Sequence, residues 1–287
     1  MNKDRDVILV SGATGQQGGA IARHLLSRGY RVRAMTRKPQ EAKAQALSAA
    51  GAQVVAADLD DAASLERALD GAWGAFAIQN TWEAGVEREE EQGKRFAEVA
   101  KKSGVSHLVY SSVGSADRDT GIPHFDNKFR VEQKVRSLGF PSWTILRPVF
   151  FMDNFLSPWF KPGIAEGKLI MAVEPDTVLQ MIAVDDIGWF GSRAFERHEE
   201  MNGLDVDIAG DQHTLPEIAQ ILSRAAGRKI EFVRAPIEEV RKGSADYAKM
   251  LEWFDRVGYD ADIEDLKKQY GYRPTSFADW AAQAKWK

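Results

Sequence analysis

The chain has 287 residues, of which 44% are hydrophobic, enough to bury the core of one large domain or of a medium and a small one. Its formal net charge of −4 argues against nucleic-acid binding, which needs a basic surface. Cysteine is absent, which excludes disulfides, catalytic thiols and thiolate metal sites.

Three further classes of protein are disfavoured by the order of the residues. The five histidines lie far apart with no pair at ligand spacing, so we expect no metal site. The charged stretch 1–6 leads straight into an apolar segment, so no secretory signal is predicted. No apolar run of 18 residues occurs, so we expect no membrane partner and a cytoplasmic location.

The first predicted elements form a strand, a glycine turn and a helix. Residues 7–10 are apolar and mostly β-branched, typical of a buried parallel strand. In the turn after this strand, Gly12 permits the tight bend, Gly15 lets a phosphate approach, and Gly18 allows close packing of helix on strand. The helix amino terminus then offers free N–H groups to an anion. This pattern predicts a dinucleotide site, whereas a purely structural turn is the alternative.

Strands and helices continue to alternate after the turn. Further strands are predicted at 30–35, 53–56, 74–78, 107–111 and 142–147, and helices after Pro39, at 64–69 with Ser64 as its cap, at about 85–103 and at 126–138. The run from Glu87 to Glu91 is interpreted as a solvated face of the third of these helices. Parallel neighbours need helical crossovers, so the fold class is α/β with a doubly wound parallel (Rossmann) sheet.

The alternation stops at Pro148, where large apolar residues crowd between prolines. A seventh strand is predicted at 204–209 and an amphipathic helix at 215–226. We therefore expect the Rossmann domain to comprise 1–150 plus about 181–210. A smaller, discontinuous α+β domain would comprise about 151–180 plus 211–287.

Candidate cofactor residues follow the strand ends, where doubly wound sheets bind ligands. Arg37 ends the second strand with no acid before Glu41, which favours the 2′-phosphate of NADP(H) over the free hydroxyl of NAD(H). A solvated surface arginine is the alternative. Asp58 and Leu59 are placed to contact adenine, although Asp58 also fits a turn or helix cap. Gln79 and Asn80 would lie along the ribose and nicotinamide.

These motifs resemble the atypical short-chain dehydrogenase/reductase superfamily. The resemblance rests on Gly12-x-x-Gly15-x-x-Gly18, Asp58-Leu59, the segment 110–113 and Arg147-Pro148; residues 124–128, 131–132 and 152–155 are similar to its NmrA-like branch. The branch includes redox-sensing regulators that bind NADP(H) and reductases of quinones or carbonyl compounds. The complete predicted cofactor set is Gly12, Thr14, Gly15, Gln16, Gln17, Gly18, Arg37, Asp58, Leu59, Gln79, Asn80, Ser111, Lys128, Pro148 and Phe150.

The chain departs from the superfamily at its catalytic pair. Hydride-transfer members use Tyr-x-x-x-Lys, but none of the six tyrosines here has a lysine four residues on. Lys128 stands at the lysine position and is expected to hold the nicotinamide ribose, while His124 stands at the tyrosine position. His124 is either a general acid or a loop histidine without a role in proton transfer. Ser112, like Ser111, either contacts substrate or cofactor or bonds the local backbone.

An aromatic cluster is the remaining candidate site. Trp82, Phe151, Met152, Asn154 and Phe155 are predicted to line a cleft for an apolar or aromatic substrate, and about half of the cluster is interpreted as core. Two functions remain open. The chain is an NADPH-dependent reductase of a quinone, enone or aromatic carbonyl compound, or an NADP(H)-sensing regulator that acts on a protein partner. The oligomeric state is also open, with a homodimer as one option.

Overall fold

The computed structural model describes residues 2–3 and 5–286. Met1 and Asp4, which belong to the charged stretch 1–6, lie outside the described residues, as does Lys287. The chain forms two compact units: unit 1 comprises 1–117, 124–147 and 187–206, and unit 2 comprises 118–123, 148–186 and 207–287. No helix among the described residues is both long and apolar enough to cross a bilayer.

The sheet of unit 1 confirms the predicted fold class. Its strands are β1 Val7–Val10, β2 Arg31–Thr36, β3 Gln53–Ala56, β4 Ala72–Ala77, β5 His107–Ser111, β6 Ser142–Pro148 and, at one edge, β10 Leu204–Ile208. They are ordered β10-β6-β5-β4-β1-β2-β3, and the pairs from β3 to β6 are parallel. The order reverses between β1 and β4, and such a switch point is where doubly wound sheets bind ligands.

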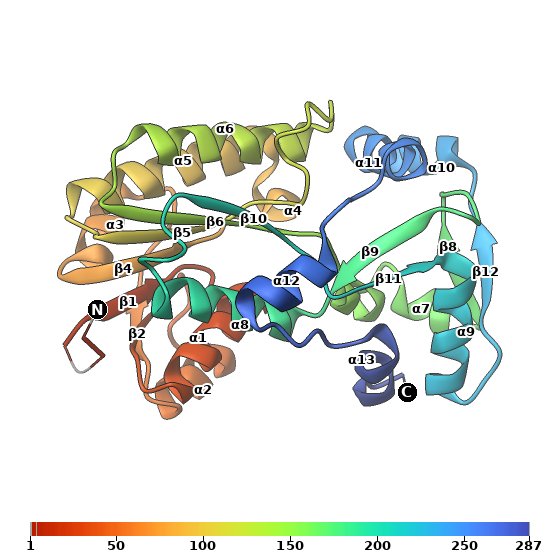
Figure 1. Ribbon diagram of the computed structural model, residues 1–287, viewed down its shortest axis with the longest axis horizontal. Coiled ribbons are helices and arrows are strands. Elements are labelled where there is room, and N and C mark those ends of the chain that lie inside the picture. The colour runs from red at the N-terminus through yellow and green to blue at the C-terminus, as the bar shows by residue number, and fades with distance from the viewer. Residues whose placement is uncertain (1, 4, 287) are drawn as a thin grey trace. The chain divides into compact units, whose positions relative to one another are not determined.

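Helices cover both faces of this sheet (Figure 1). One face carries α1 Gln16–Ser27, α2 Ala42–Ala49 and α8 Val184–Glu196; the other carries α3 Ala62–Leu69, α5 Val86–Lys102 and α6 Pro123–Ser137. Glycines set the closest helix contacts. A Cβ on Gly191 of α8 would lie 2.6 Å from Ile21 of α1, and one on Gly93 of α5 would lie 2.9 Å from Val131 of α6.

Two helix starts differ from the prediction. Ser64 is not the cap of α3, which begins earlier, because the Asp61 carboxylate accepts hydrogen bonds from the backbone N–H groups of Ala63 at 3.0 Å and Ser64 at 3.2 Å. Helix α6 begins at Pro123 rather than Asp126. Proline suits a first helical turn because its missing N–H would have no intrahelical partner there.

The acidic run on α5 is not wholly a solvated face. Glu87, Arg88 and Glu91 are exposed, but Glu89 is 1% exposed. Glu89 shares the buried face of α5 with Gly93, Phe96 and Ala100, which follow it at four, seven and eleven residues. The prediction was therefore wrong at Glu89.

A buried ion pair joins α6 to the sheet. Arg147 at the end of β6 is 3% exposed and makes two hydrogen bonds, of 2.9 and 2.7 Å, to the fully buried carboxylate of Glu132. Arg136 and Asp205 extend the network at the surface. A buried charge without a partner is costly, so this pair constrains where α6 lies on the sheet.

Unit 2 has two small sheets and short helices. One sheet is ordered β11-β9-β7 and the other β12-β8. The strands are β7 Phe150–Phe151, β8 Lys168–Met171, β9 Val178–Ile182, β11 Asp211–Thr214 and β12 Glu231–Arg234. The helices are the 3₁₀ helix η1 Met152–Leu156, α7 Lys161–Ala165, α9 Leu215–Ala226, α10 Ile237–Gly243, α11 Ala245–Arg256, α12 Ile263–Tyr270 and α13 Phe277–Gln283.

Phe155 lies at the centre of the aromatic core of unit 2, with ring centroids 5.6 Å from Phe150 and 5.4 Å from both Phe160 and Phe277. Elsewhere in this unit, Asp186 accepts hydrogen bonds from the Tyr272 hydroxyl at 2.7 Å and from the backbone and side chain of Thr275 at 2.9 Å. Burial nevertheless raises the pKa of Asp186 above its ordinary value.

The stability of the protein is expected to fall below pH 6.5 because of His107. Burial, with a smaller contribution from His198, lowers the pKa of His107 from 6.5 to about 3. The unfolded chain therefore binds a proton that the folded chain rejects, and stability is lost as pH falls. From pH 7 to pH 5 this residue should remove about 2 kcal/mol.

Urea denaturation at both pH values, with His107→Asn as the comparison, measures this effect. The variant should lose about that much of the pH dependence; an unchanged dependence would contradict the assignment.

Candidate functional site

The glycine turn between β1 and α1 is built by backbone packing. Gly12 has φ +58°, in the left-handed region, and a Cβ there would lie 2.9 Å from Ile78. A Cβ on Gly18 would lie 2.6 Å from the backbone oxygen of Ser11 and closer still to that of Gly12. The Ser11 hydroxyl oxygen accepts a hydrogen bond from the backbone N–H of Ile78 at 2.9 Å, which links the end of β1 to the end of β4.

The amino terminus of α1 is open to a ligand. Gly15 occupies the cap position, and no side chain in the described chain caps this end. Gly12, Gly15 and Gln16 are exposed, and Thr14 and Gln17 are partly exposed. Uncapped N–H groups and the positive end of the helix dipole suit a pyrophosphate.

Arg37 stands at the end of β2, as predicted, but it has a partner that the sequence did not reveal. Its guanidinium is ion-paired with Glu83 on the short helix α4 Thr81–Ala84, and both side chains are more than half exposed. The hydrogen bond with Glu83 raises the pKa of Arg37 above its ordinary value. A 2′-phosphate bound by Arg37 would therefore compete with Glu83.

Asp58 and Leu59 follow β3. The Asp58 carboxylate accepts a hydrogen bond from the backbone N–H of Asp60 at 3.0 Å, a local turn that leaves its second oxygen for a ligand. Leu59 packs against the core of unit 1 and is partly buried. Contact of these residues with adenine stays a prediction.

Lys128 and His124 lie one turn apart on α6, on the same face of the helix. The Lys128 ammonium donates to Glu89 on α5 at 2.6 Å and its side chain is 12% exposed. His124 is 6% exposed, with its ring centroid 5.2 Å from that of Trp82 and 4.9 Å from that of Phe125. The early start of α6 therefore places the two candidate residues on one element.

The remaining polar candidates of unit 1 lie beyond β4 and β5. Ser111 donates to the Gln17 side chain at 2.7 Å, which links the end of β5 to the start of α1. Ser112 and Gln79 are buried, and their side-chain polar atoms have no hydrogen-bond partner among the described residues. Asn80 caps α4 by accepting from the backbone N–H of Trp82 at 3.1 Å.

The predicted substrate residues are divided between the units. Trp82 belongs to unit 1 and is 64% exposed. Phe151, Met152, Asn154 and Phe155 belong to unit 2, as do Pro148 and Phe150 of the cofactor set. Met152 and Phe155 are fully buried, whereas Phe151 and Asn154 are partly exposed. Their contacts with cofactor or substrate stay predictions.

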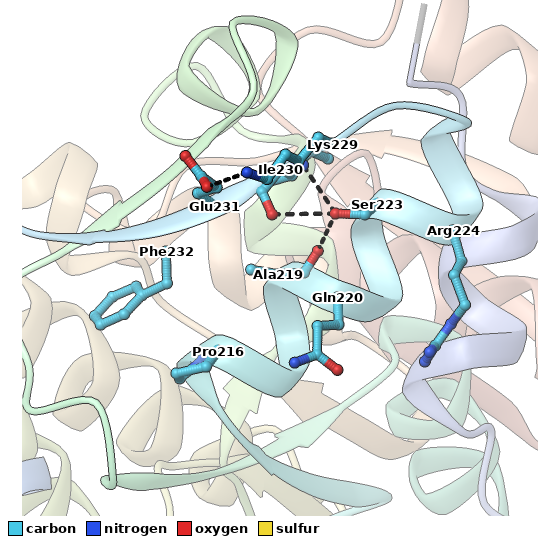
Figure 2. A pocket seen from close by; sticks show the side chains of 9 residues that line it. All are labelled: Pro216, Ala219, Gln220, Ser223, Arg224, Lys229, Ile230, Glu231 and Phe232. Atoms are coloured by element: carbon cyan, nitrogen blue, oxygen red, sulfur yellow. Dashed lines mark hydrogen bonds and ion pairs between the residues drawn. The ribbon is translucent and has the colours of Figure 1, made fainter.

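A hollow of about 540 Å³ lies elsewhere, between α9 and β12 of unit 2 (Figure 2). Ser223 in its wall is hydrogen-bonded to Ala219 and Ile230, and Lys229 is ion-paired with Glu231. None of the predicted site residues lines it. Within the described part of the chain, no cluster of carboxylates and histidines is arranged to hold a metal ion.

Sequence reasoning missed Glu83 and Glu89. Glu83 is 46 residues from Arg37, and nothing local marks that contact. Glu89 could have been found, because its spacing to Phe96 and Ala100 places it on the apolar face of α5.

Comparison with known proteins decides the family. The model of the NmrA-like family matches residues 4–280. The chain belongs to this family. It is 37% identical to the NmrA-like oxidoreductase FrzB of Cladobotryum over 94% of this chain and 84% of the relative. It is 30% identical to a Streptomyces griseus (4-alkanoyl-5-oxo-2,5-dihydrofuran-3-yl)methyl phosphate reductase over 96% and 97% of the two chains.

A solved structure supports the same placement. The Escherichia coli NADPH-dependent quinone oxidoreductase in complex with NADPH is 25% identical and superposes with a TM-score of 0.80, covering 96% of this chain and 98% of that one. This chain therefore shares its fold with a protein whose solved structure contains NADPH.

We expect Gly18→Ala to disrupt the glycine turn. The added methyl group would meet the backbone oxygens of Ser11 and Gly12, which directly follow β1, and should lower the free energy of unfolding by about 3 kcal/mol. Gly19→Ala is the matched control, since its Cβ would lie 3.2 Å from the nearest backbone oxygen. Urea denaturation of both variants measures the difference, and equal losses would contradict the account.

Proposed function

We propose that this member of the NmrA-like family is an NADPH-dependent reductase of a quinone, enone or aromatic carbonyl compound. One observation carries the proposal: a glycine turn too tightly packed for a Cβ, followed by an uncapped helix amino terminus at the switch point of the sheet. The relatives named oxidoreductase or reductase support turnover, and the NADPH complex of the quinone oxidoreductase supports the cofactor and the substrate class.

The residues present fit the dinucleotide. Backbone N–H groups at the start of α1 would hold its pyrophosphate, Arg37 its 2′-phosphate and Lys128 its nicotinamide ribose. When bound, NADPH supplies a hydride. The substrate gains that hydride and a proton, and the proton would come from His124, Ser112 or water. Hydride addition to a quinone would give a stabilised phenolate-like anion, which then takes one proton to become the hydroquinone, so water suffices as the proton donor and the missing tyrosine is no obstacle.

A second function is favoured by the lost Tyr-x-x-x-Lys pair and by the burial of His124 against Trp82. In this alternative the chain binds NADP(H) without turnover and passes its occupancy to a protein partner. The two functions share the cofactor site and differ only in the events after binding.

Arg37→Ala should weaken NADPH binding about 10- to 100-fold and leave NADH binding unchanged, because only the 2′-phosphate needs the guanidinium. Fluorescence titration with both cofactors measures this effect. Lys38→Ala is the control, since Lys38 is an exposed neighbour paired with Glu41. Equal affinity of the native protein for NADPH and NADH would contradict the assignment of NADP(H) as the cofactor.

The native protein should oxidise NADPH in the presence of at least one quinone, enone or aryl ketone. The loss of NADPH absorbance measures this turnover. Lys128→Met should lower kcat/KM about 100-fold, because the nicotinamide ribose loses its charged donor. Lys134→Met on the same helix, which removes a partner of Glu98, should have little effect. Tight NADPH binding with no turnover on the whole panel would favour the regulator.

A further inference from the structure

The buried carboxylate of Glu89 joins three elements of unit 1. Its oxygens accept from the Lys128 ammonium of α6 at 2.6 Å, from the Asn127 side chain of α6 at 2.9 Å and from the Thr81 hydroxyl of α4. Glu89 itself lies on α5 and is 1% exposed. The proposed reaction assigns no role to the Glu89 carboxylate.

The charge of Glu89 is matched by Lys128. Burial alone would raise the pKa of Glu89, but the Lys128 ammonium and the hydrogen bonds from Lys128, Thr81 and Asn127 hold it below its ordinary value. In the described part of the chain, Glu89 is the carboxylate ion-paired with Lys128. The Glu89 carboxylate is therefore ionised at neutral pH, beside the Lys128 ammonium.

Two uncharged side chains, Tyr110 and Gln79, approach this pair from other elements of unit 1. The Tyr110 hydroxyl of β5 is buried, and burial raises the pKa of Tyr110 well above its ordinary value. Gln79 beyond β4 lies against Gly93 of α5, where a Cβ would be 3.1 Å from its side-chain oxygen. Glu90, the next residue of α5, is paired with Arg130 and Lys94 instead.

An ammonium group has three N–H donors. One points to Glu89, which leaves two for the hydroxyls of a ribose, and the direction of the first bond sets the direction of the others. Thr81 and Asn127 in turn fix the carboxylate, so the orientation of the Lys128 donors is determined before any ligand arrives.

We propose that Glu89 is the positioning residue of the nicotinamide end of the cofactor site: it aims the Lys128 ammonium at the nicotinamide ribose. This inference rests on the proposed function, because it assigns a specific task to the same site. It does not make Glu89 a catalytic residue, because the carboxylate bonds Lys128, Asn127 and Thr81 and would act on the cofactor through Lys128.

The test compares two probes on the same variants. NADPH carries the nicotinamide ribose, whereas adenosine 2′,5′-bisphosphate lacks it and cannot reach Lys128. Glu89→Gln should weaken NADPH binding about tenfold or more and leave binding of adenosine 2′,5′-bisphosphate unchanged. Glu90→Gln is the matched control and should change neither affinity. A general loss of stability would instead weaken the binding of both probes.

A double-variant cycle separates positioning from structural support. In the Lys128→Met background, Glu89→Gln should cause no further loss of NADPH affinity, because there is no ammonium left to aim. Additive losses would overturn the inference. If Glu89→Gln does not fold, Thr81→Val tests the same point, since it removes one bond to Glu89 and retains both charges. It should weaken NADPH binding about two- to fivefold and spare the bisphosphate; unchanged NADPH affinity would overturn the inference.

The same measurements distinguish a failure of the proposed function from a failure of this inference. A native protein that binds neither NADPH nor the bisphosphate overturns the cofactor assignment and this inference with it. A native protein that binds both, with NADPH affinity independent of Glu89, overturns this inference alone.

Discussion

The close approach of α1 to the turn after β1 is the constraint on which the candidate site depends. At Gly18 the helix lies so near the backbone oxygens of Ser11 and Gly12 that no side chain fits. This contact fixes the axis of α1 and thereby aims its uncapped N–H groups along the carboxyl edge of the sheet. Ser11 reinforces the geometry by bonding the end of β4. The backbone alone thus shapes the site that we propose for the pyrophosphate.

Charged groups organise the opposite face of the sheet. Two buried pairs, Glu132 with Arg147 and Glu89 with Lys128, hold α6 to β6 and to α5. Each buried charge restricts its helix to one position, because any shift would leave a charge without its partner. The first pair joins α6 to the end of β6, whereas the second ends at Lys128, the residue that we assign to the nicotinamide ribose. A buried ion pair therefore holds α6 to the sheet in one place, and in the other it orients a residue of the proposed site.

The sequence predicted what depends on local pattern. The strand, glycine turn and first helix, the alternation of strands and helices, and the placement of Arg37 at a strand end all follow from residues close together in the chain. Tertiary contacts were not accessible in this way: the Arg37–Glu83 pair spans 46 residues, and a run of like charges hid the buried position of Glu89. Helix starts were misjudged because Asp61 outcompetes Ser64 for the cap and because Pro123 fits a first turn.

A crystal structure of the native protein with NADPH tests the central claim most directly. We expect the pyrophosphate against the backbone N–H groups at the start of α1 and the 2′-phosphate on Arg37 in place of Glu83. The nicotinamide ribose should lie within hydrogen-bond distance of the Lys128 ammonium, which stays paired with Glu89. A cofactor bound away from the Gly12–Gly18 turn, or a ribose that does not contact Lys128, would contradict it.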